Sequence, residues 1–326
     1  NKIIIATGSR AKKMPKMPID DIKIIDYRKA MTLEKQPSSL IIVGAGAIGL
    51  EFAYFYQALG TKVTIIEFMD RLAPIEDIDV SKALEKSFKK MGITVLTNSK
   101  VEIAKSHPTN VRVVVSTPKE TLNLEADILL SAVGITPNIE NIGLEHVGLE
   151  IESGKIKVDK FYKTNIEGYY AIGDVVGGQA LAHVASAEGI ICVEAISGHH
   201  PEPLDYNNIP GCTYCSPEIA SVGFTEAKAI EKGYEVLIGK FPFSASGKAK
   251  ASGNSDGFVK LVYDKKYGEL LGAHFIGANV TEMIAEIVVA RKLETTGHQI
   301  IKSVHPHPTM SEAIMEATAA AYGEVI

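Results

Sequence analysis

Hydrophobic residues follow two different spacings in the first half of the chain. Short apolar runs predict strands at 40–43, 62–67 and 94–96, and the apolar run 127–134 closes this region. Apolar residues three and four positions apart predict helices at 48–59 and 80–91. Strands that alternate with helices are typical of an α/β domain, whose parallel sheet is covered on both faces.

A different pattern follows the prolines near residue 203. Apolar runs predict the strands of an antiparallel sheet at 212–214, 219–222, 235–241, 258–263 and 270–276. Helical spacing predicts helices at 280–293 and 310–321, and one more between the two halves at 180–197. We therefore expect a separate α+β domain in the second half.

Composition limits the classes of protein to which the chain can belong. The 326 residues are 46% hydrophobic and 22% charged, which is ordinary for a globular protein of about two domains. The formal net charge is -5 without a basic block, so a nucleic-acid-binding protein is disfavoured. The longest apolar stretch, 40–50, is far shorter than the roughly 20 residues of a membrane span, and we expect no membrane segment.

Three cysteines and a start without a leader favour the cytoplasm or an organelle matrix. Cys212 and Cys215 match Cys-x-x-Cys, which elsewhere marks a redox dithiol or half a zinc site. No second pair exists, so a structural role is favoured, and Cys192 is expected in the core. His199 and His200 lack an obvious third ligand, and we expect no metal site.

The strongest chemical motif is a Gly-x-Gly-x-x-Gly turn between a strand and a helix. Gly44 permits the tight turn, Gly46 lets a pyrophosphate approach the backbone, and Gly49 lets the helix pack closely on the sheet. The phosphates would lie at the helix N-terminus. Glu67 ends the next strand, where a carboxylate binds ribose hydroxyls and repels a 2'-phosphate, so NAD is favoured over NADP. The alternative is a tight turn without a ligand.

Glu51 lies two residues after the last glycine of this turn, at the start of an apolar helix. Its charge can stabilise the helix N-terminus by about 0.3–1 kcal/mol. It can equally lie near the nicotinamide end of a dinucleotide. The spacing alone leaves both interpretations open.

A stiff segment near the C-terminus carries two histidines, each followed by a proline. Thr309 and Glu312 fit a capping box that opens the last helix. Glu312 is then a cap and His307 a turn residue. Alternatively, the carboxylate orients the imidazole and makes His307 a general acid or base near neutral pH. One helix N-terminus could serve both interpretations.

Several short motifs stand in an order and spacing typical of one family. They are 5–9 (IATGS), the turn 44–51, 132–138 (AVGITPN), 171–174 (AIGD), 181–183 (LAH), and 307–309 (HPT) with Glu312. With these motifs, the chain resembles the flavin-dependent pyridine nucleotide-disulfide oxidoreductases over essentially all 326 residues. It is most similar to the members that oxidise dihydrolipoamide with NAD. The resemblance implies α/β Rossmann-like nucleotide-binding domains and an α+β dimerisation domain.

The resemblance implies a site for FAD. The expected FAD-contacting residues are Ala6, Thr7, Gly8, Gly173, Asp174, Leu181, Ala182 and His183. Asp174 is expected to bond the ribityl chain, and the backbone of Ala182 to face the isoalloxazine ring.

The resemblance also implies an NAD site and a catalytic base. Ile48 and Glu51 are expected beside the nicotinamide, and Gly134 in the lining of the NAD cleft. His307 is expected to exchange a proton with the substrate dithiol while Glu312 orients it.

The resemblance further implies a homodimer, because the family places this histidine in the partner subunit's active site. The implied substrates are lipoyl groups of a 2-oxo acid dehydrogenase or glycine cleavage complex, with no nucleic-acid or membrane partner. The expected segments are an FAD-domain remnant (1–37), an NAD-binding domain (38–136), an FAD/central domain (137–203) and an interface domain (204–326).

The chain departs from the family pattern in one large respect. The family's redox pair, Cys-x4-Cys, is absent from the 326 residues, as is roughly the first third of the family chain. We therefore expect the C-terminal portion of a dihydrolipoamide-oxidising enzyme that is inactive by itself. Another disulfide reductase or transhydrogenase of the family, and a non-catalytic nucleotide-binding module, stay open as alternatives.

Overall fold

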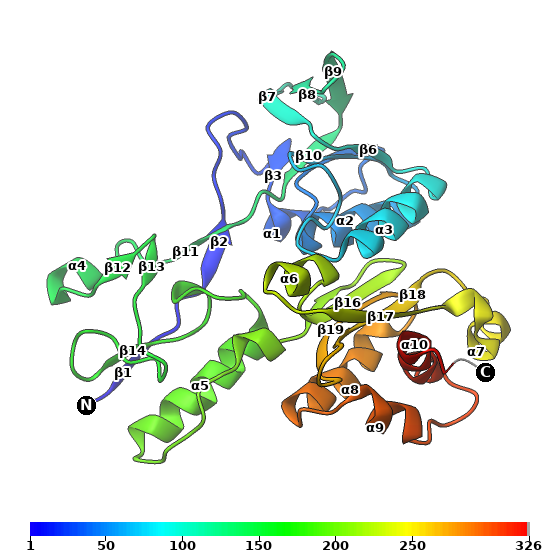
Figure 1. Cartoon of the computed structure of the whole chain (residues 1–326). Helices are drawn as coiled ribbons and strands as arrows, with labels where there is room; N and C mark the ends of the chain where they lie inside the picture. Colours follow the sequence, from blue (N-terminus) through cyan, green and yellow to red (C-terminus); the bar gives the residue numbers. More distant parts are fainter. Residues whose placement is uncertain (325–326) are drawn as a thin grey trace. The chain divides into compact units, whose positions relative to one another are not determined.

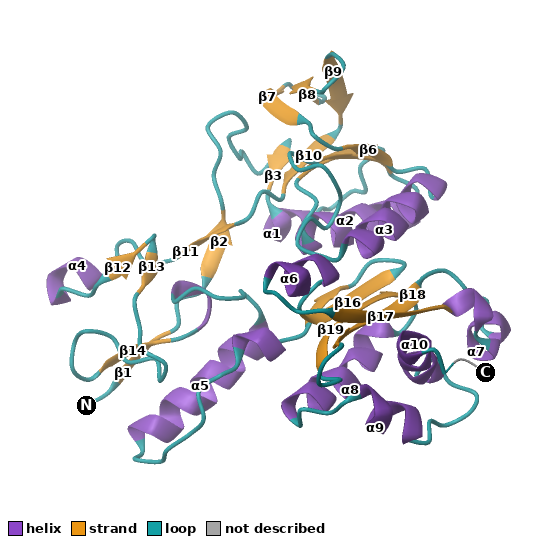
Figure 2. Ribbon diagram, in the orientation of Figure 1, coloured by secondary structure: helices purple, strands orange, loops and turns teal. Residues whose placement is uncertain are grey.

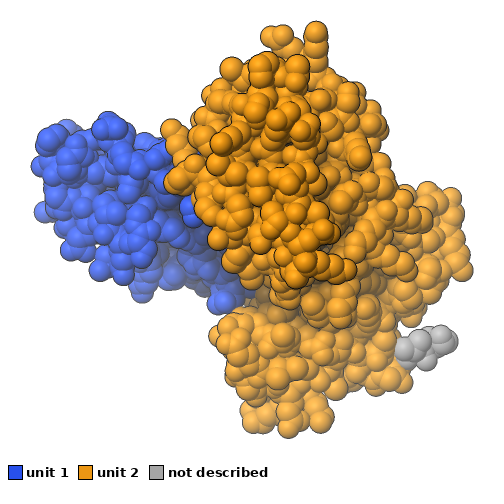
Figure 3. Space-filling model, turned by 90° about the horizontal axis from the view of Figure 1, so that it is seen from above, with its two compact units in different colours: residues 1–12, 134–209 blue, residues 13–133, 210–326 orange. Residues whose placement is uncertain are grey.

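The computed structural model of the chain describes residues 1–324. Contacts divide the chain into two compact units (Figure 3). Unit 1 contains residues 1–12 and 134–209, and unit 2 contains residues 13–133 and 210–326. Each unit has buried apolar clusters of its own.

The parallel-sheet half of unit 2 (13–133) contains the predicted α/β domain (Figure 1). Its five parallel strands are ordered β3 (Ile24–Ile25), β10 (Ile128–Ser131), β4 (Ser39–Val43), β5 (Lys62–Ile66) and β6 (Thr94–Leu96). Its helices are α1 (Tyr27–Ala30), α2 (Ala47–Ala58) and α3 (Ile78–Lys90). The predicted strands and both predicted helices are confirmed, with small shifts at their ends.

The two faces of this parallel sheet are covered differently. On one face, Ile42 and Ile65 share a buried cluster with Leu84 of α3. On the other face, Ile41 shares a cluster with three valines of β8. β8 (Val111–Ser116) is the middle strand of an antiparallel sheet with β7 (Lys100–Ser106) and β9 (Thr121–Ala126). The sequence analysis missed these strands, although buried and less buried residues alternate along β8 with the period of a strand.

The antiparallel half of unit 2 (210–326) is the predicted α+β domain. Its strand order is β15 (Gly211–Thr213), β16 (Glu218–Gly223), β19 (Leu270–Gly277), β18 (Phe258–Asp264) and β17 (Val236–Pro242). All neighbouring strands are antiparallel, as predicted.

Helices cover this antiparallel sheet (Figure 2). α8 (Val280–Lys292) contacts β16 and β19, and α10 (Glu312–Tyr322) contacts β17 and β18. Both helices were predicted. Three shorter helices were not, because five or six residues are too few to show a helical period: α6 (Glu226–Glu231), α7 (Gly247–Ala251) and α9 (Gly297–Lys302).

Unit 1 is built around short strand pairs and one long helix. β1 (Ile3–Ile5) pairs parallel to β14 (Tyr169–Ala171), and β2 (Ser9–Ala11) pairs antiparallel to β11 (Ile135–Pro137). The predicted helix is confirmed as α5 (Ala182–Ile196). The remaining elements are α4 (Leu144–Val147), β12 (Ile151–Glu152), β13 (Lys155–Ile156), and the 3-10 turns η1 (Gly173–Val175) and η2 (Tyr206–Asn208).

The compact units differ from the predicted segments at their boundaries. Residues 13–37, expected in the FAD-domain remnant, include β3, which pairs with β10 of the parallel sheet. A two-residue strand is too short to reveal its partner in the sequence. The other boundaries of the units follow residues 133 and 209 rather than 136 and 203. The division into four segments remains a prediction.

Residues 1–324 contain neither a membrane-spanning helix nor a cluster of metal ligands. No helix in this range has the length and apolar character needed to cross a membrane. No group of three or more metal-type side chains occurs in this range either.

Candidate functional site

The glycine turn joins β4 to α2 and leaves open space at one position. A Cβ atom on Gly44, where φ is +105°, would lie 2.4 Å from the Ala132 carbonyl oxygen. A Cβ on Gly49 would lie 2.0 Å from the Gly44 oxygen. At Gly46, the N-cap residue of α2, a Cβ would meet nothing within 4 Å. Gly44 and Gly49 therefore permit close packing, while Gly46 borders free space at a helix N-terminus.

Glu67 directly follows β5 and is buried. Its Oε2 accepts the Ala45 N–H at 2.6 Å, and its Oε1 accepts the Met69 N–H at 2.7 Å. Each carboxylate oxygen has a second lone pair for a further donor. The position of Glu67 at the strand end agrees with the prediction, and its second role, holding the glycine turn, was not predicted.

Glu51 lies one helical turn after Ile48 on α2. Its Oε1 accepts the backbone N–H of Tyr214 at 2.9 Å. This bond links α2 to the antiparallel half of unit 2, a role that neither sequence-based interpretation included. Gly134 belongs to unit 1, where φ is +106° and its carbonyl accepts the Lys12 N–H at 3.0 Å.

The residues expected at FAD lie in unit 1, near two turns and the start of α5. Ala6 and Thr7 are exposed, and the Thr7 hydroxyl donates to the Asn138 carbonyl at 2.6 Å. Gly8 has φ +68° with nothing within 4 Å of a Cβ. Leu181 is the N-cap of α5, and Ala182 and His183 are exposed in its first turn.

The Gly173–Asp174 turn is held by groups that the sequence analysis missed. Ser9 donates its hydroxyl to Asp174 Oδ2 at 2.5 Å. Glu188, fully buried on α5, accepts the Gly173 N–H at 2.6 Å and the Tyr206 hydroxyl at 2.5 Å. Burial and the bond to Glu188 raise the pKa of Tyr206, so the phenol remains a donor. An acidic residue inside an apolar helix was the available signal.

His307 is exposed and paired with a carboxylate. Its Nδ1 lies 2.8 Å from Glu312 Oε1, while 78% of its side chain is accessible to solvent. Glu312 Oε2 accepts the Thr309 N–H at 2.7 Å. This backbone bond and then the His307 bond lower the pKa of Glu312. His307 Nε2 has no hydrogen-bond partner in the part of the chain that the structure describes.

The predicted capping box is wrong in one half. Thr309 donates its hydroxyl to the Pro306 carbonyl at 2.7 Å, and the N-cap of α10 is Ser311. Glu312 is therefore the first residue of α10, where it accepts a backbone N–H as the box predicts and also contacts His307. The neighbouring His305 is different, because Glu286 and the Ser303 carbonyl occupy its two ring nitrogens.

Comparisons with known proteins identify the family of the chain. Residues 1–189 match the model described as pyridine nucleotide-disulphide oxidoreductase, and residues 209–318 match its dimerisation domain. The chain belongs to the pyridine nucleotide-disulphide oxidoreductase family. The predicted family resemblance and fold class are thereby confirmed.

Individual relatives of this oxidoreductase chain carry a consistent description. It is 45% identical to a dihydrolipoyl dehydrogenase of Rhizobium etli, over 99% of this chain and 68% of that protein. It is 46% identical to one of Zymomonas mobilis, over 99% of this chain and 70% of that protein. A crystal structure of LpdA from Mycobacterium tuberculosis matches with a TM-score of 0.90 at 28% identity, covering 97% of this chain and 69% of that one.

Membership of the oxidoreductase family settles the class of cofactor. The relatives belong to a family of NAD-dependent flavoprotein enzymes that use FAD and NAD. The open space at Gly46 and the acidic Glu67 fit a dinucleotide. The exposed residues at the start of α5 and the turn at Asp174 fit a second nucleotide cofactor in unit 1.

The cysteines of the oxidoreductase chain are free thiols. Burial raises the pKa of Cys215 to about 12, and burial also raises the pKa of Cys212. A raised pKa disfavours the thiolate that redox chemistry needs. These thiols fit the structural role predicted for the Cys-x-x-Cys pair, and Cys192 is buried in unit 1 as predicted.

Proposed function

We propose that the protein oxidises dihydrolipoamide with NAD. The names of the relatives at 45% and 46% identity support this substrate. When bound, FAD and NAD supply the redox chemistry, while the chain supplies binding, orientation and proton transfer. The observation that carries the proposal is the hydrogen bond between the exposed His307 imidazole and Glu312.

The role proposed for His307 is proton transfer at its Nε2 atom. Since Glu312 is a carboxylate, it accepts the proton on Nδ1 and leaves a lone pair on Nε2. A neutral imidazole of this tautomer can take a proton from a thiol near neutral pH. The Thr309 N–H keeps the carboxylate in place by binding its other oxygen.

The glycine turn is the proposed NAD site. The diphosphate is expected against the amide groups that open α2, beside the free space at Gly46. Glu67 is expected to accept hydrogen bonds from the ribose and to disfavour a 2'-phosphate. Ile48 and Glu51 are proposed beside the nicotinamide, and Gly134 is proposed as a further NAD-site residue on the basis of the family resemblance.

The proposed FAD site belongs to unit 1. Asp174 accepts one hydrogen bond from Ser9 at Oδ2, and its carboxylate can accept more. We expect the ribityl hydroxyls to donate to it. The backbone of Ala182 is expected to face the isoalloxazine ring. Further contacts are proposed for the exposed turn and helix residues Ala6, Thr7, Gly8, Gly173, Leu181 and His183.

The proposed partners are a second copy of the chain and a lipoyl-bearing protein. The match of residues 209–318 to the dimerisation domain supports a homodimer. The exposure of His307 suits a base that completes the partner subunit's active site. We further propose the lipoyl groups of a 2-oxo acid dehydrogenase or glycine cleavage complex as substrates, in the cytoplasm or an organelle matrix.

The 326-residue chain by itself is proposed to bind NAD without turning over dihydrolipoamide. Its three cysteines stand at 192, 212 and 215, so none forms the Cys-x4-Cys pair of the family. Titration of the purified chain with NADH and NADPH should show tighter binding of NADH. An assay with dihydrolipoamide, NAD and added FAD should show no turnover. Normal turnover, or preferred binding of NADPH, would refute these assignments.

A further inference from the structure

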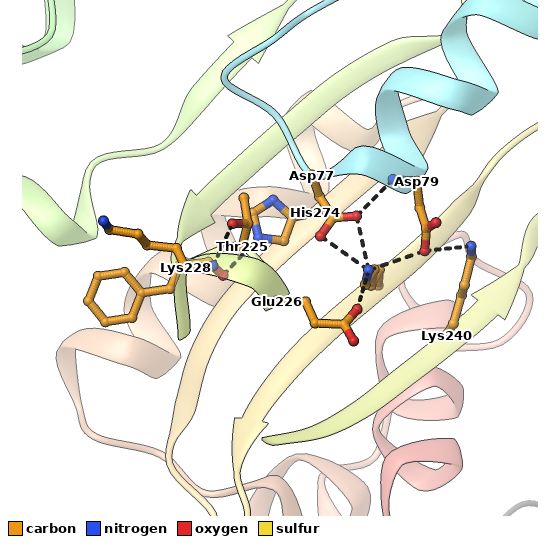
Figure 4. Close-up of polar contacts among 9 residues, drawn as sticks. Asp77, Asp79, Thr225, Glu226, Lys228, Lys240 and His274 are labelled. Carbon is orange, nitrogen blue, oxygen red and sulfur yellow. Dashed lines mark hydrogen bonds and ion pairs between the residues drawn. The ribbon is translucent and has the colours of Figure 1, made fainter. Parts of the chain in front are cut away.

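An ion cluster with a buried centre at Lys260 and Asp77 joins the two halves of unit 2 (Figure 4). Lys260 of β18 is only 2% exposed, and its Nζ atom donates to Asp77 at 2.9 Å. The same ammonium donates to Asp79 at 3.1 Å and to Glu226 at 2.8 Å. Lys240 also contacts Asp79, at 3.1 Å. The ammonium group of one lysine therefore binds carboxylates at the start of α3 and on α6.

The contacts in this ion cluster shift the pKa values of Lys260 and Asp79. Although burial disfavours the ammonium, the hydrogen bonds that Lys260 donates to Glu226 and Asp77 raise its pKa. Although burial disfavours the carboxylate, hydrogen bonds from Lys240 and Lys260 lower the pKa of Asp79. His274 faces Lys260 across β18 and β19, and burial lowers its pKa, so it adds no positive charge. The cluster contains the carboxylates of Asp77, Asp79 and Glu226 and the amino groups of Lys240 and Lys260.

Asp77 connects this cluster to the start of α3. It is the N-cap residue, 2% exposed, and its side chain accepts the Asp79 N–H at 2.9 Å. Its carbonyl accepts the Ser81 N–H at 3.1 Å, and the Ser81 hydroxyl donates to the Ala73 carbonyl at 3.1 Å. The first turn of α3 is thereby bonded to the preceding loop.

That loop continues to the glycine turn. The Ala73 N–H donates to the Ala45 carbonyl at 3.0 Å, and the Ala45 N–H donates to Glu67 at 2.6 Å. Ala45 is fully buried, and it directly precedes Gly46. Both polar backbone groups of Ala45 are therefore held, one by the strand-end carboxylate and one by the loop that ends at Asp77.

We propose that the buried pair of Lys260 and Asp77 positions Ala45, and through it the phosphate-binding turn. The antiparallel half of unit 2 thereby contributes positioning residues to a glycine turn that belongs to the other half. Nucleotide affinity depends on this pair without contact between the pair and the nucleotide. The proposal rests on the NAD site proposed above.

Glu226 provides a matched control for Asp77. Both carboxylates bind the same ammonium, at 2.8 and 2.9 Å. Glu226 belongs to α6 and is linked to the glycine turn through Lys260, whereas Asp77 also caps the start of α3 directly. Loss of either charge perturbs Lys260, but only loss of the Asp77 charge acts directly on the loop that holds Ala45.

The experiment compares Asp77→Asn with Glu226→Gln in the purified chain. Asparagine preserves the N-cap acceptor, so α3 still starts at the same residue. Fluorescence titration should show the dissociation constant for NADH raised about 10-fold in Asp77→Asn. It should change less than about 2-fold in Glu226→Gln. Equal weakening in both variants, or no weakening in a folded Asp77→Asn protein, overturns the proposal.

Amide hydrogen exchange gives a readout that general destabilisation does not produce. In Asp77→Asn, the Ala45 amide should exchange faster relative to the amides of the β17–β18 pair. In Glu226→Gln, its exchange rate should be unchanged. Lys260→Met should reproduce the Asp77→Asn effect, and the double variant should add nothing to it. If Lys260→Met does not fold, the Asp77 comparison decides alone.

Failure of the proposed function has a different outcome. A wild-type chain without NADH binding refutes the NAD site, while exchange at Ala45 still tests the positioning role. A wild-type chain that binds NADH, with identical Asp77→Asn and Glu226→Gln variants, refutes only the positioning role.

Discussion

The glycine turn and the histidine segment, which carry the two sites proposed above, are built in opposite ways. The turn uses backbone groups and buried contacts, since Ala45 is fully buried and Gly49 has no room for a Cβ atom. The histidine segment uses side chains at the surface, where His307 is 78% exposed. Changes at the buried positions of the turn should therefore alter the stability of the fold. Changes at His307 should alter chemistry and leave the fold intact.

The largest expected effect tests the surface half of this comparison. In a full-length, FAD-loaded homodimer that includes the family's Cys-x4-Cys pair, His307→Gln should lower the turnover of dihydrolipoamide by about 100- to 10,000-fold, because a general acid/base contributes that much. The free energy of unfolding should change by less than about 0.5 kcal/mol, because the side chain is exposed. Steady-state kinetics and urea unfolding of the same preparation measure the two quantities.

His305→Gln is the matched control for this variant. The His305 side chain is only 8% exposed, and both ring nitrogens have partners. Its replacement should cost about 1–3 kcal/mol of stability and leave proton transfer largely intact. If His307→Gln lost stability while turnover persisted, the roles assigned to the two histidines would be reversed.

The second expected effect concerns the loop that supports the turn. Glu76 Oε2 is buried and has no hydrogen-bond partner among the described residues. Burial raises the pKa of Glu76 from 4.5 to about 7, although a hydrogen bond from Ser221 lowers it. A carboxyl group whose pKa is higher in the folded than in the unfolded protein stabilises the fold fully at pH values below the unfolded-state pKa. This stabilisation is lost as the pH rises through the folded-state pKa. Stability should therefore decline between about pH 4.5 and 7.

Glu76→Gln should remove this decline. Relative to the wild type, its free energy of unfolding should rise by about 3 kcal/mol between pH 4.5 and pH 8. Urea unfolding at several pH values measures the difference. Glu85→Gln, a change at a half-buried position of α3 whose carboxylate contacts Lys89, should leave the pH profile as it was. Parallel profiles for wild type and Glu76→Gln would contradict the shifted pKa.

The third effect separates folding from binding within the turn. Gly49→Ala places a Cβ 2.0 Å from the Gly44 oxygen, so α2 must shift and stability should fall by about 1–3 kcal/mol. Gly46→Ala meets nothing within 4 Å, so it should lose affinity for NADH with a smaller loss of stability. Thermal unfolding and NADH titration of both variants provide the test. Equal stability losses would mean that the turn lacks the predicted division of roles.

The features that could be predicted from the sequence are those that depend on the spacing of nearby residues. Three glycines and Glu67 lie within 24 residues, so strand, turn, helix and carboxylate could be placed in order. The Asp77–Lys260 bond spans 183 positions, and Lys260 lies in a strand whose pattern is apolar. Its partners depend on how the two halves of unit 2 meet, which no local pattern contains. Glu188 was visible as an odd residue in an apolar helix, but its two partners were not.

The smallest expected effect concerns the choice of nucleotide at the turn. Glu67→Gln removes the charge, and its single carbonyl oxygen replaces two oxygens that accept from Ala45 and Met69. Stability should fall by about 1 kcal/mol, since one of the two bonds is lost. The ratio of the dissociation constants for NADPH and NADH should fall about 5-fold, because repulsion of a 2'-phosphate is relieved. Glu51→Gln keeps an acceptor for Tyr214 and should leave that ratio unchanged, because NADH and NADPH share the nicotinamide end. An unchanged ratio in Glu67→Gln would assign the preference for NAD to another part of the turn.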